Sequence, residues 1–174
     1  DILSEYICSN KQLPDKSFLL TFDDGFREIA DIIAPILFRK GVPAIFFINP
    51  AVIDNKKLLY RNKISLIIEA LRNNKILQNE VAGFFGMQNK FDEETLYRFL
   101  KQLTQNDMEF VEQISNHVEI DEDMYLKLHQ PYLSEDQVKS LSALGFRFGG
   151  HSWDHPYYKL LDEQSQIEQT LLSC

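Results

Sequence analysis

Two buried strands separated by one helix stand near the start of this chain, and this order constrains its fold more than any other feature. Residues 17–22 and 44–48 are largely apolar runs of strand length. Between them, residues 27–40 predict a helix that Gly41 ends and whose apolar face carries Ile29, Ile32, Ile33, Ile36 and Leu37. Because strand–helix–strand units form right-handed parallel crossovers, we expect an α/β fold.

A long helical stretch separates this unit from the next strand. It shows helical periodicity in four places, at residues 62–73, 92–104, 107–116 and 121–129. Regular order then returns, because Ser134 and Gln137 form a capping box and residues 146–150 form a short third strand. Residues 51–133, approximately, are therefore predicted to be a helical insertion between the second and third strands.

The composition excludes several classes of protein. Hydrophobic and charged fractions of 44% and 25% are ordinary for a globular domain. A net charge of -8 argues against a partner such as nucleic acid or an anionic lipid surface. No apolar run approaches the roughly 20 residues that span a bilayer. Cys8 and Cys174 form neither a metal-type pair nor a disulfide framework.

Two adjacent carboxylates, Asp23 and Asp24, follow the first strand. Reacting groups gather at the carboxyl ends of the strands in barrels and open α/β folds. A turn at Gly25 would end the alternation of the strand and let both carboxylates face one cavity. A solvated Asp-Asp-Gly turn is the competing interpretation, because Asp and Gly are common in turns.

Two histidines, His151 and His155, follow the third strand. This spacing is typical of metal ligands, and it stacks the two rings on one face if the intervening turn is helical. Pro156 limits such a helix to a single turn, because the residue before a proline avoids the helical conformation. The alternative is a pair of surface histidines in a loop, although the chain has only four histidines.

The two motifs together describe a metal site with a neighbouring base. Asp24, His151 and His155 suit a divalent ion, with zinc expected and an open position for water, although ligand type also admits other metals. Asp23 is then the candidate general base for a water whose pKa the metal lowers to about 7. The combination predicts metal-assisted hydrolysis of a carbonyl substrate. A phosphatase of the haloacid type would need an Asp-x-Asp motif and leaves the histidines unexplained.

Residues 21–25 and 151–155 resemble the first two motifs of the polysaccharide deacetylases, the NodB-homology family or carbohydrate esterase family four. The resemblance implies that Asp23 is the base and that Asp24, His151 and His155 bind the metal. It implies hydrolysis of carbon–nitrogen amide bonds in an acetylated glycan, with N-acetyl groups expected, and a bacterial extracytoplasmic location. It also implies that residues 1–174 form part of one domain, an incomplete (β/α) barrel of the distorted seven-stranded deacetylase type.

The resemblance also exposes missing parts. Family members carry later motifs with an Arg that orients the base and a His that acts as general acid, but neither residue type follows His155. We therefore expect this chain to be a portion of the domain. If it were complete, it would be a carbohydrate-binding or inactive relative, and a small-molecule amidohydrolase of the same superfamily also fits. The glycan, the metal and the oligomeric state stay open.

The insertion is the second departure from the family pattern. Because it leaves the carboxyl end of a strand, we expect it to shape access of the substrate to the site. Phe84 and Phe85 are candidates for a platform that stacks against sugar rings. Burial in the core of the insertion is the favoured alternative, because aromatic side chains are usually buried.

Overall fold

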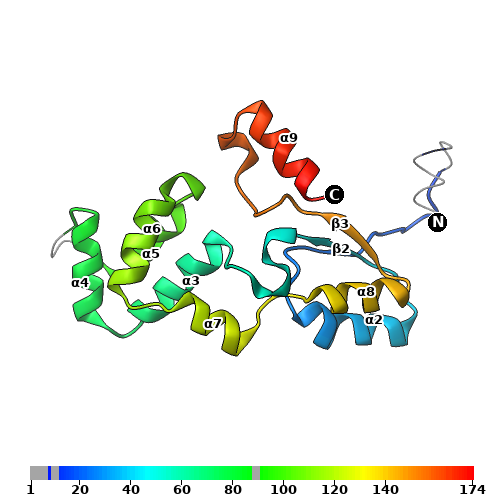
Figure 1. The fold of residues 1–174 in the computed structure, drawn as a ribbon, viewed down its shortest axis with the longest axis horizontal. Coiled ribbons are helices and arrows are strands. Elements are labelled where there is room, and N and C mark those ends of the chain that lie inside the picture. The colour runs from blue at the N-terminus through cyan, green and yellow to red at the C-terminus, as the bar shows by residue number, and fades with distance from the viewer. Residues whose placement is uncertain (1–7, 9–11, 88–90) are drawn as a thin grey trace.

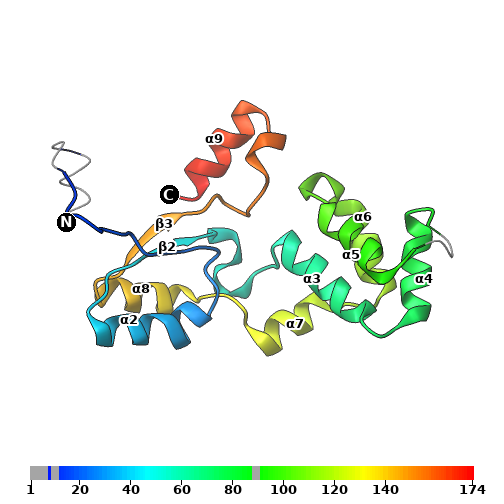
Figure 2. The same cartoon turned by 180° about the vertical axis from the view of Figure 1, so that it is seen from behind.

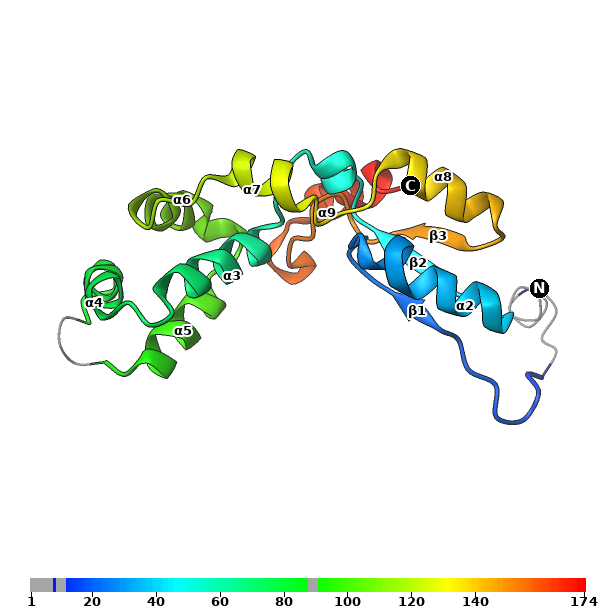
Figure 3. The same ribbon diagram turned by 90° about the horizontal axis from the view of Figure 1, so that it is seen from below.

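Three short parallel strands form the sheet of this protein. The computed structural model describes residue 8 and residues 12–87 and 91–174. The strands follow the order β1 (Thr21–Phe22), β2 (Ile45–Ile48) and β3 (Arg147–Gly150). Figure 1 labels β2 and β3, and Figure 3 labels all three. Phe22, Phe46 and Phe148 lie in register across them, so their rings pack together on one face. The predicted α/β class and parallel pairing are confirmed, whereas the incomplete barrel of the distorted seven-stranded deacetylase type stays a prediction.

The first strand is shorter than the sequence predicted. Residues 17–20 lie outside β1, and the side chains of Phe18 and Leu19 are 80% and 54% exposed. An apolar run forms a strand only where a neighbouring strand pairs with it. In the described part of the chain, β1 has β2 as its one paired strand.

Two helices, α2 (Ala34–Lys40) and α8 (Glu135–Ala143), cover one face of the sheet (Figures 1 and 2). The predicted helix over 27–40 begins with a π-helical turn, η1 (Ile29–Ile33), in which the backbone N–H of Ala34 donates to the carbonyl of Ile29. This wider turn shifts the buried face to Ile29, Ala34 and Leu37. Ile32 and Ile36, which were predicted to be on the apolar face, are exposed as a result.

The insertion is a separate group of helices beside the sheet. It contains α3 (Tyr60–Leu71), α4 (Lys75–Phe84), α5 (Glu93–Gln102), α6 (Met108–His117) and α7 (Glu122–His129), with the short helices η2 (Pro50–Asn55) and η3 (Gln105–Asp107). Four of these helices match the predicted stretches, and α4 was not predicted. Figure 3 shows the insertion and the sheet with its helices as two arms that meet near the end of the chain.

The two ends of the insertion are tied together next to the sheet. The side-chain amide of Asn55 accepts a hydrogen bond from the backbone N–H of Tyr132 (2.9 Å) and donates to its carbonyl (3.3 Å). The ring of the buried Tyr132 stacks on Phe26, just after β1. The backbone N–H of Leu133 then donates to Gly25 (2.9 Å). The insertion therefore starts and ends beside the Asp-Asp-Gly turn.

The chain closes with η4 (Tyr158–Leu160) and α9 (Glu163–Leu172). The N-cap of this last helix is Asp162, whose side chain accepts a hydrogen bond from the backbone N–H of Ser165. Among the described helices, none is long and apolar enough to cross a membrane.

Candidate metal centre

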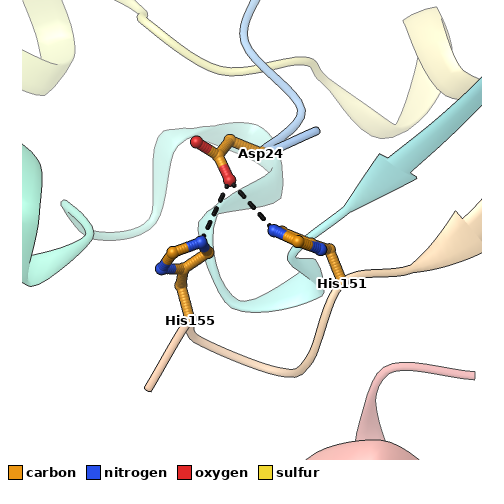
Figure 4. Close-up of side chains that lie close together, drawn as sticks. All are labelled: Asp24, His151 and His155. Carbon is orange, nitrogen blue, oxygen red and sulfur yellow. Dashed lines mark ion pairs between the residues drawn. The ribbon is translucent and has the colours of Figure 1, made fainter. Parts of the chain in front are cut away.

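Asp24, His151 and His155, the three predicted ligands, meet at the carboxyl ends of the strands (Figure 4). One ligand atom from each residue lies within 4.8 Å of the other two. Nε2 of His151 is 3.4 Å from Asp24 Oδ1, and Nε2 of His155 is 3.3 Å from the same oxygen. The fold therefore brings together two motifs that are far apart in the sequence.

These distances fit ligands of a shared ion better than direct hydrogen bonds. Metal–ligand distances of about 2.0–2.1 Å in a tetrahedral zinc site place neighbouring ligand atoms roughly 3.3 Å apart. Hydrogen bonds from N–H to oxygen are usually about 2.7–3.2 Å long. Asp24 Oδ1 is buried and has no hydrogen-bond partner among the described residues. Because a buried carboxylate oxygen needs a compensating cation or donor, the residues present fit a divalent metal.

The turn after β1 directs Asp24 into the site. Asp24 and Gly25 both adopt left-handed backbone conformations, with φ of 70° and 72°. Asp tolerates this region better than most residues. A Cβ on Gly25 would lie 3.2 Å from Cγ2 of Ile48, so the turn also requires glycine for its close approach to β2.

The histidine loop, residues 151–155, is irregular and contains no helical turn. The prediction of a helical turn is therefore wrong, and the reason is the backbone: Ser152 and His155 both have positive φ, at 65° and 66°. The loop folds back because the N–H of His155 donates to Oγ of Ser152 (3.1 Å). The two imidazole centroids still lie 4.9 Å apart.

Asn49 holds the histidine loop against the sheet, and the sequence analysis did not identify it. Its side chain is fully buried, and Nδ2 donates to the backbone carbonyls of His151 and Ser152. Asn49 directly follows the central strand, so it lies between the strand ends that carry Asp24 and His151. The sequence signal for Asn49 was a polar residue directly after a buried strand. An Asn-Pro pair that simply ends a strand gives the same pattern, so the signal did not single out Asn49.

The surroundings of His155 favour the form of imidazole that binds metal. Burial lowers its pKa below the ordinary value, and the nearby Asp24 carboxylate opposes this effect only in part. A lowered pKa keeps the ring neutral at neutral pH, and only a neutral imidazole has a free lone pair for a metal.

The family of the chain follows from comparison with known proteins. The model of the polysaccharide deacetylase family matches residues 10–174. This chain belongs to the polysaccharide deacetylase family.

One solved structure shares the fold of this deacetylase-family chain. The Streptococcus pyogenes deacetylase PplD in complex with acetate matches with a TM-score of 0.51 and 13% sequence identity. The match covers 98% of this chain and 44% of that chain, so the present chain spans less than half the length of its neighbour. No curated protein matches it.

In this deacetylase-family chain, two further elements support the histidine loop at Asp154. Gln169 of α9 accepts hydrogen bonds from the backbone N–H groups of Trp153 (3.0 Å) and Asp154 (3.3 Å), and its amide donates to Asp154 Oδ1 (2.8 Å). Lys57, at the start of the insertion, pairs with Asp154 Oδ2 at 2.9 Å. The loop is therefore connected to the last helix and to the insertion.

Asp23, the predicted base, is exposed and makes no hydrogen bond or ion pair with another described residue. It lines a hollow of about 400 Å³ together with Phe22, Phe26 and Glu28. An exposed, unpaired carboxylate is free to accept a proton from water. Its catalytic role stays a prediction.

A second hollow, of about 360 Å³, separates the histidine loop from the insertion. Asp154 and Pro156 line it on the loop side, and Lys63 and Glu112 are among the residues on the insertion side. The buried Lys63 pairs with Glu112 and also with Glu122, at 2.5 Å from the latter. Because the charges lining the hollow largely pair with each other, it suits a neutral polar molecule.

The aromatic pair Phe84 and Phe85 ends α4, which lies at the far side of the insertion from the sheet (Figure 1). Phe85 packs against the core of the insertion, with its ring centroid 5.2 Å from Phe110 and 6.0 Å from Phe99. This packing favours the interpretation of Phe85 as a core residue over a sugar-stacking platform.

Proposed function

We propose that this chain carries the metal- and water-binding part of a hydrolase that removes acetyl groups from a glycan, with N-acetyl groups as the expected target. The observation that supports this most is the convergence of Asp24, His151 and His155 in a member of the polysaccharide deacetylase family. Each of the three comes from a motif whose residue types suit metal-assisted hydrolysis.

Asp24, His151 and His155 would hold the divalent ion, and one carboxylate with two imidazoles makes zinc the expected metal. Such an ion would supply Lewis-acid chemistry, which makes water more acidic and polarises a carbonyl group. The half-buried carboxylate of Asp24, whose Oδ1 is shielded from solvent, contributes negative charge, and the lowered pKa of His155 leaves its ring ready to bind.

Asp23 acts in this proposal as the general base. Its carboxylate accepts a proton from the water that attacks the acetyl carbonyl. The carbon–nitrogen bond then breaks while the nitrogen takes up a proton from solvent, so that acetate is released and an amine remains on the sugar. The exposure of Asp23 and its lack of a described partner are compatible with this task.

The same proposal assigns residues 1–174 to part of one deacetylase domain, in which the three strands belong to a larger distorted barrel. The insertion would form one wall of the path taken by the glycan. The hollow beside the histidine loop supports this placement, because its paired charges suit a neutral, hydroxyl-rich sugar.

Replacing Asp23 with Asn in the full-length protein tests the proposed base. Metal content would be measured by mass spectrometry, and acetate release would be followed on N-acetylated and O-acetylated oligosaccharides. We expect the metal to be retained, since Asp23 is not among the three converging residues. Turnover should fall by roughly 10²–10⁴-fold, the usual contribution of a general base.

Glu28→Gln is the matched control, because Glu28 is an exposed carboxylate that lines the same hollow as Asp23. It should leave turnover unchanged. Undiminished turnover in Asp23→Asn would contradict the assignment of the base. Acetate release from small amides alone would instead favour a small-molecule amidohydrolase, and bound glycan without release would favour a carbohydrate-binding relative.

A further inference from the structure

Tyr157 connects the histidine loop to the interior of the insertion. The insertion core is a cluster of buried residues from α3, α4, α5 and α6, extending to Val118. Among the described hydrophobic residues that pack against it, Tyr157 is the one that comes from outside residues 51–133. It lies only two positions after His155. The core of the insertion therefore includes a side chain from the segment that carries a candidate ligand.

Both the ring and the backbone of Tyr157 are held by the insertion. The guanidinium of Arg61, on α3, lies 4.5 Å from the ring centroid of Tyr157, and the ring of Tyr60 lies 6.4 Å away. Gln105, in η3, accepts a hydrogen bond from the backbone N–H of Tyr157 (3.2 Å) and donates to its carbonyl (3.3 Å). The amide of Gln105 thus satisfies both backbone groups of Tyr157, as a neighbouring strand would.

His155 depends on such support from its neighbours. Its backbone is left-handed, with φ of 66°, which is unfavourable for a residue other than glycine. Its own N–H is bonded within the loop, to Ser152. On one side Asp154 is fixed by Lys57 and Gln169, and on the other side Tyr157 is fixed by the insertion.

The ion pair between Lys57 and Asp154 is a weaker connection to the insertion than Tyr157 is. Both side chains are partly exposed, and exposed pairs contribute little because water screens them. A single backbone hydrogen bond from the N–H of Ala51 to the carbonyl of Trp153 (3.2 Å) is a further connection. Tyr157 combines packing against a buried core with two backbone hydrogen bonds. It is therefore the most extensive of the connections between the insertion and the loop.

We propose that the insertion positions a metal ligand: Tyr157 and Gln105 hold His155 where its Nε2 faces Asp24. This inference rests on the proposed function, in that Asp24, His151 and His155 must bind a divalent ion. Tyr157 and Gln105 are positioning residues in this account and do not touch the ion.

The test is the affinity of the full-length protein for Zn²⁺, measured by competition with a chromogenic chelator. Tyr157→Ala should weaken the affinity by about 10–100-fold, as the loss of residues that orient metal ligands usually does. Gln105→Ala should weaken it in the same direction by less. Tyr157→Phe should keep the wild-type affinity, because the aromatic ring and the backbone hydrogen bonds to Gln105 remain.

Tyr158→Ala provides the matched control. Tyr158 is the adjacent tyrosine, but its hydroxyl bonds to Thr170 of α9 and not to the insertion. It should bind Zn²⁺ as wild type does. Thermal unfolding of each metal-free variant checks that an affinity change is not a loss of folding, and Gln105→Ala serves if Tyr157→Ala does not fold.

The outcomes separate the two proposals. If wild type binds no Zn²⁺, the proposed function fails. If wild type binds Zn²⁺ and folded Tyr157→Ala and Gln105→Ala bind it equally well, the positioning role of the insertion is wrong while the metal site stands.

Discussion

The insertion and the sheet unit, by which we mean the three strands with α2 and α8, bury their apolar side chains in different ways. The insertion encloses a core whose innermost residues are fully shielded from solvent, namely Ile67, Leu71, Val81, Ala82, Leu96, Leu100, Val111 and Ile114. Around the sheet unit, Phe18, Ile32 and Phe38 are each more than half exposed. The insertion also has exposed apolar side chains, Ile76 and Leu128, but these lie on its surface and its core remains closed.

This difference separates structural support from chemistry. All three converging ligands extend from the ends of the sheet strands, where backbone groups and loops meet. The insertion, which packs mainly against itself, contributes none of them and instead contacts the loop that carries two. A unit with its own core is well suited to hold a neighbouring loop, because its stability does not depend on that loop alone.

The largest expected effect distinguishes a histidine of the sheet unit from one of the insertion. His151→Ala should abolish metal binding and hydrolysis, because it removes one of three ligands. His117→Ala should change neither, since His117 lies 3.0 Å from Glu80 in the insertion. Metal content after dialysis and acetate release would measure both. Equal metal loss in the two variants would contradict the claim that the metal ligands come from the strand ends and not from the insertion.

A smaller effect concerns the stability of the two cores. Phe46→Ala should lower the free energy of unfolding by about 3–5 kcal/mol, because Phe46 is fully buried among three other phenylalanine rings. Ile67→Ala should cost about 2–5 kcal/mol within the insertion. Urea unfolding followed by hydrogen exchange would locate each loss. We expect Phe46→Ala to expose the sheet unit first and Ile67→Ala the helices; loss of protection over the whole chain in both would show one cooperative unit.

The smallest effect is expected at the edge of the insertion. Phe84→Ala should cost about 1 kcal/mol, because the side chain is 41% exposed and its ring has an edge contact with Phe110. Glycan hydrolysis should not change, since α4 is remote from the sheet (Figure 1). A higher KM for long oligosaccharides with unchanged stability would revive the platform interpretation of this aromatic pair.

Local interactions explain what could be predicted from the sequence. The capping box of Ser134 and Gln137 was predicted, because it joins atoms within three residues of one another. The second strand was predicted from its apolar run. The prediction was correct because β2 pairs with a strand on each of its two edges. The candidate ligands were found because each motif places its residues directly after a strand.

Helix α4 shows why some elements escaped prediction. Its residue Gln78 interrupts the apolar pattern, yet its side chain is 1% exposed. The amide of Gln78 donates to the carbonyl of Leu71, at the end of α3 (2.9 Å). A polar residue fits this core position only because the neighbouring helix offers an unpaired acceptor, which no pattern within α4 reveals.

The sequence by itself determined the strand–helix–strand start, the place of the insertion and the identity of the three candidate ligands, because these depend on residue type and short-range spacing. The tertiary structure alone decided how the ligands meet. Contacts between distant segments determine three features: the left-handed backbone of Asp24 and His155, the buried amide of Asn49, and the packing of Tyr157 against the insertion core. Such contacts form only when the folded chain brings unpaired donors, acceptors and apolar surfaces together.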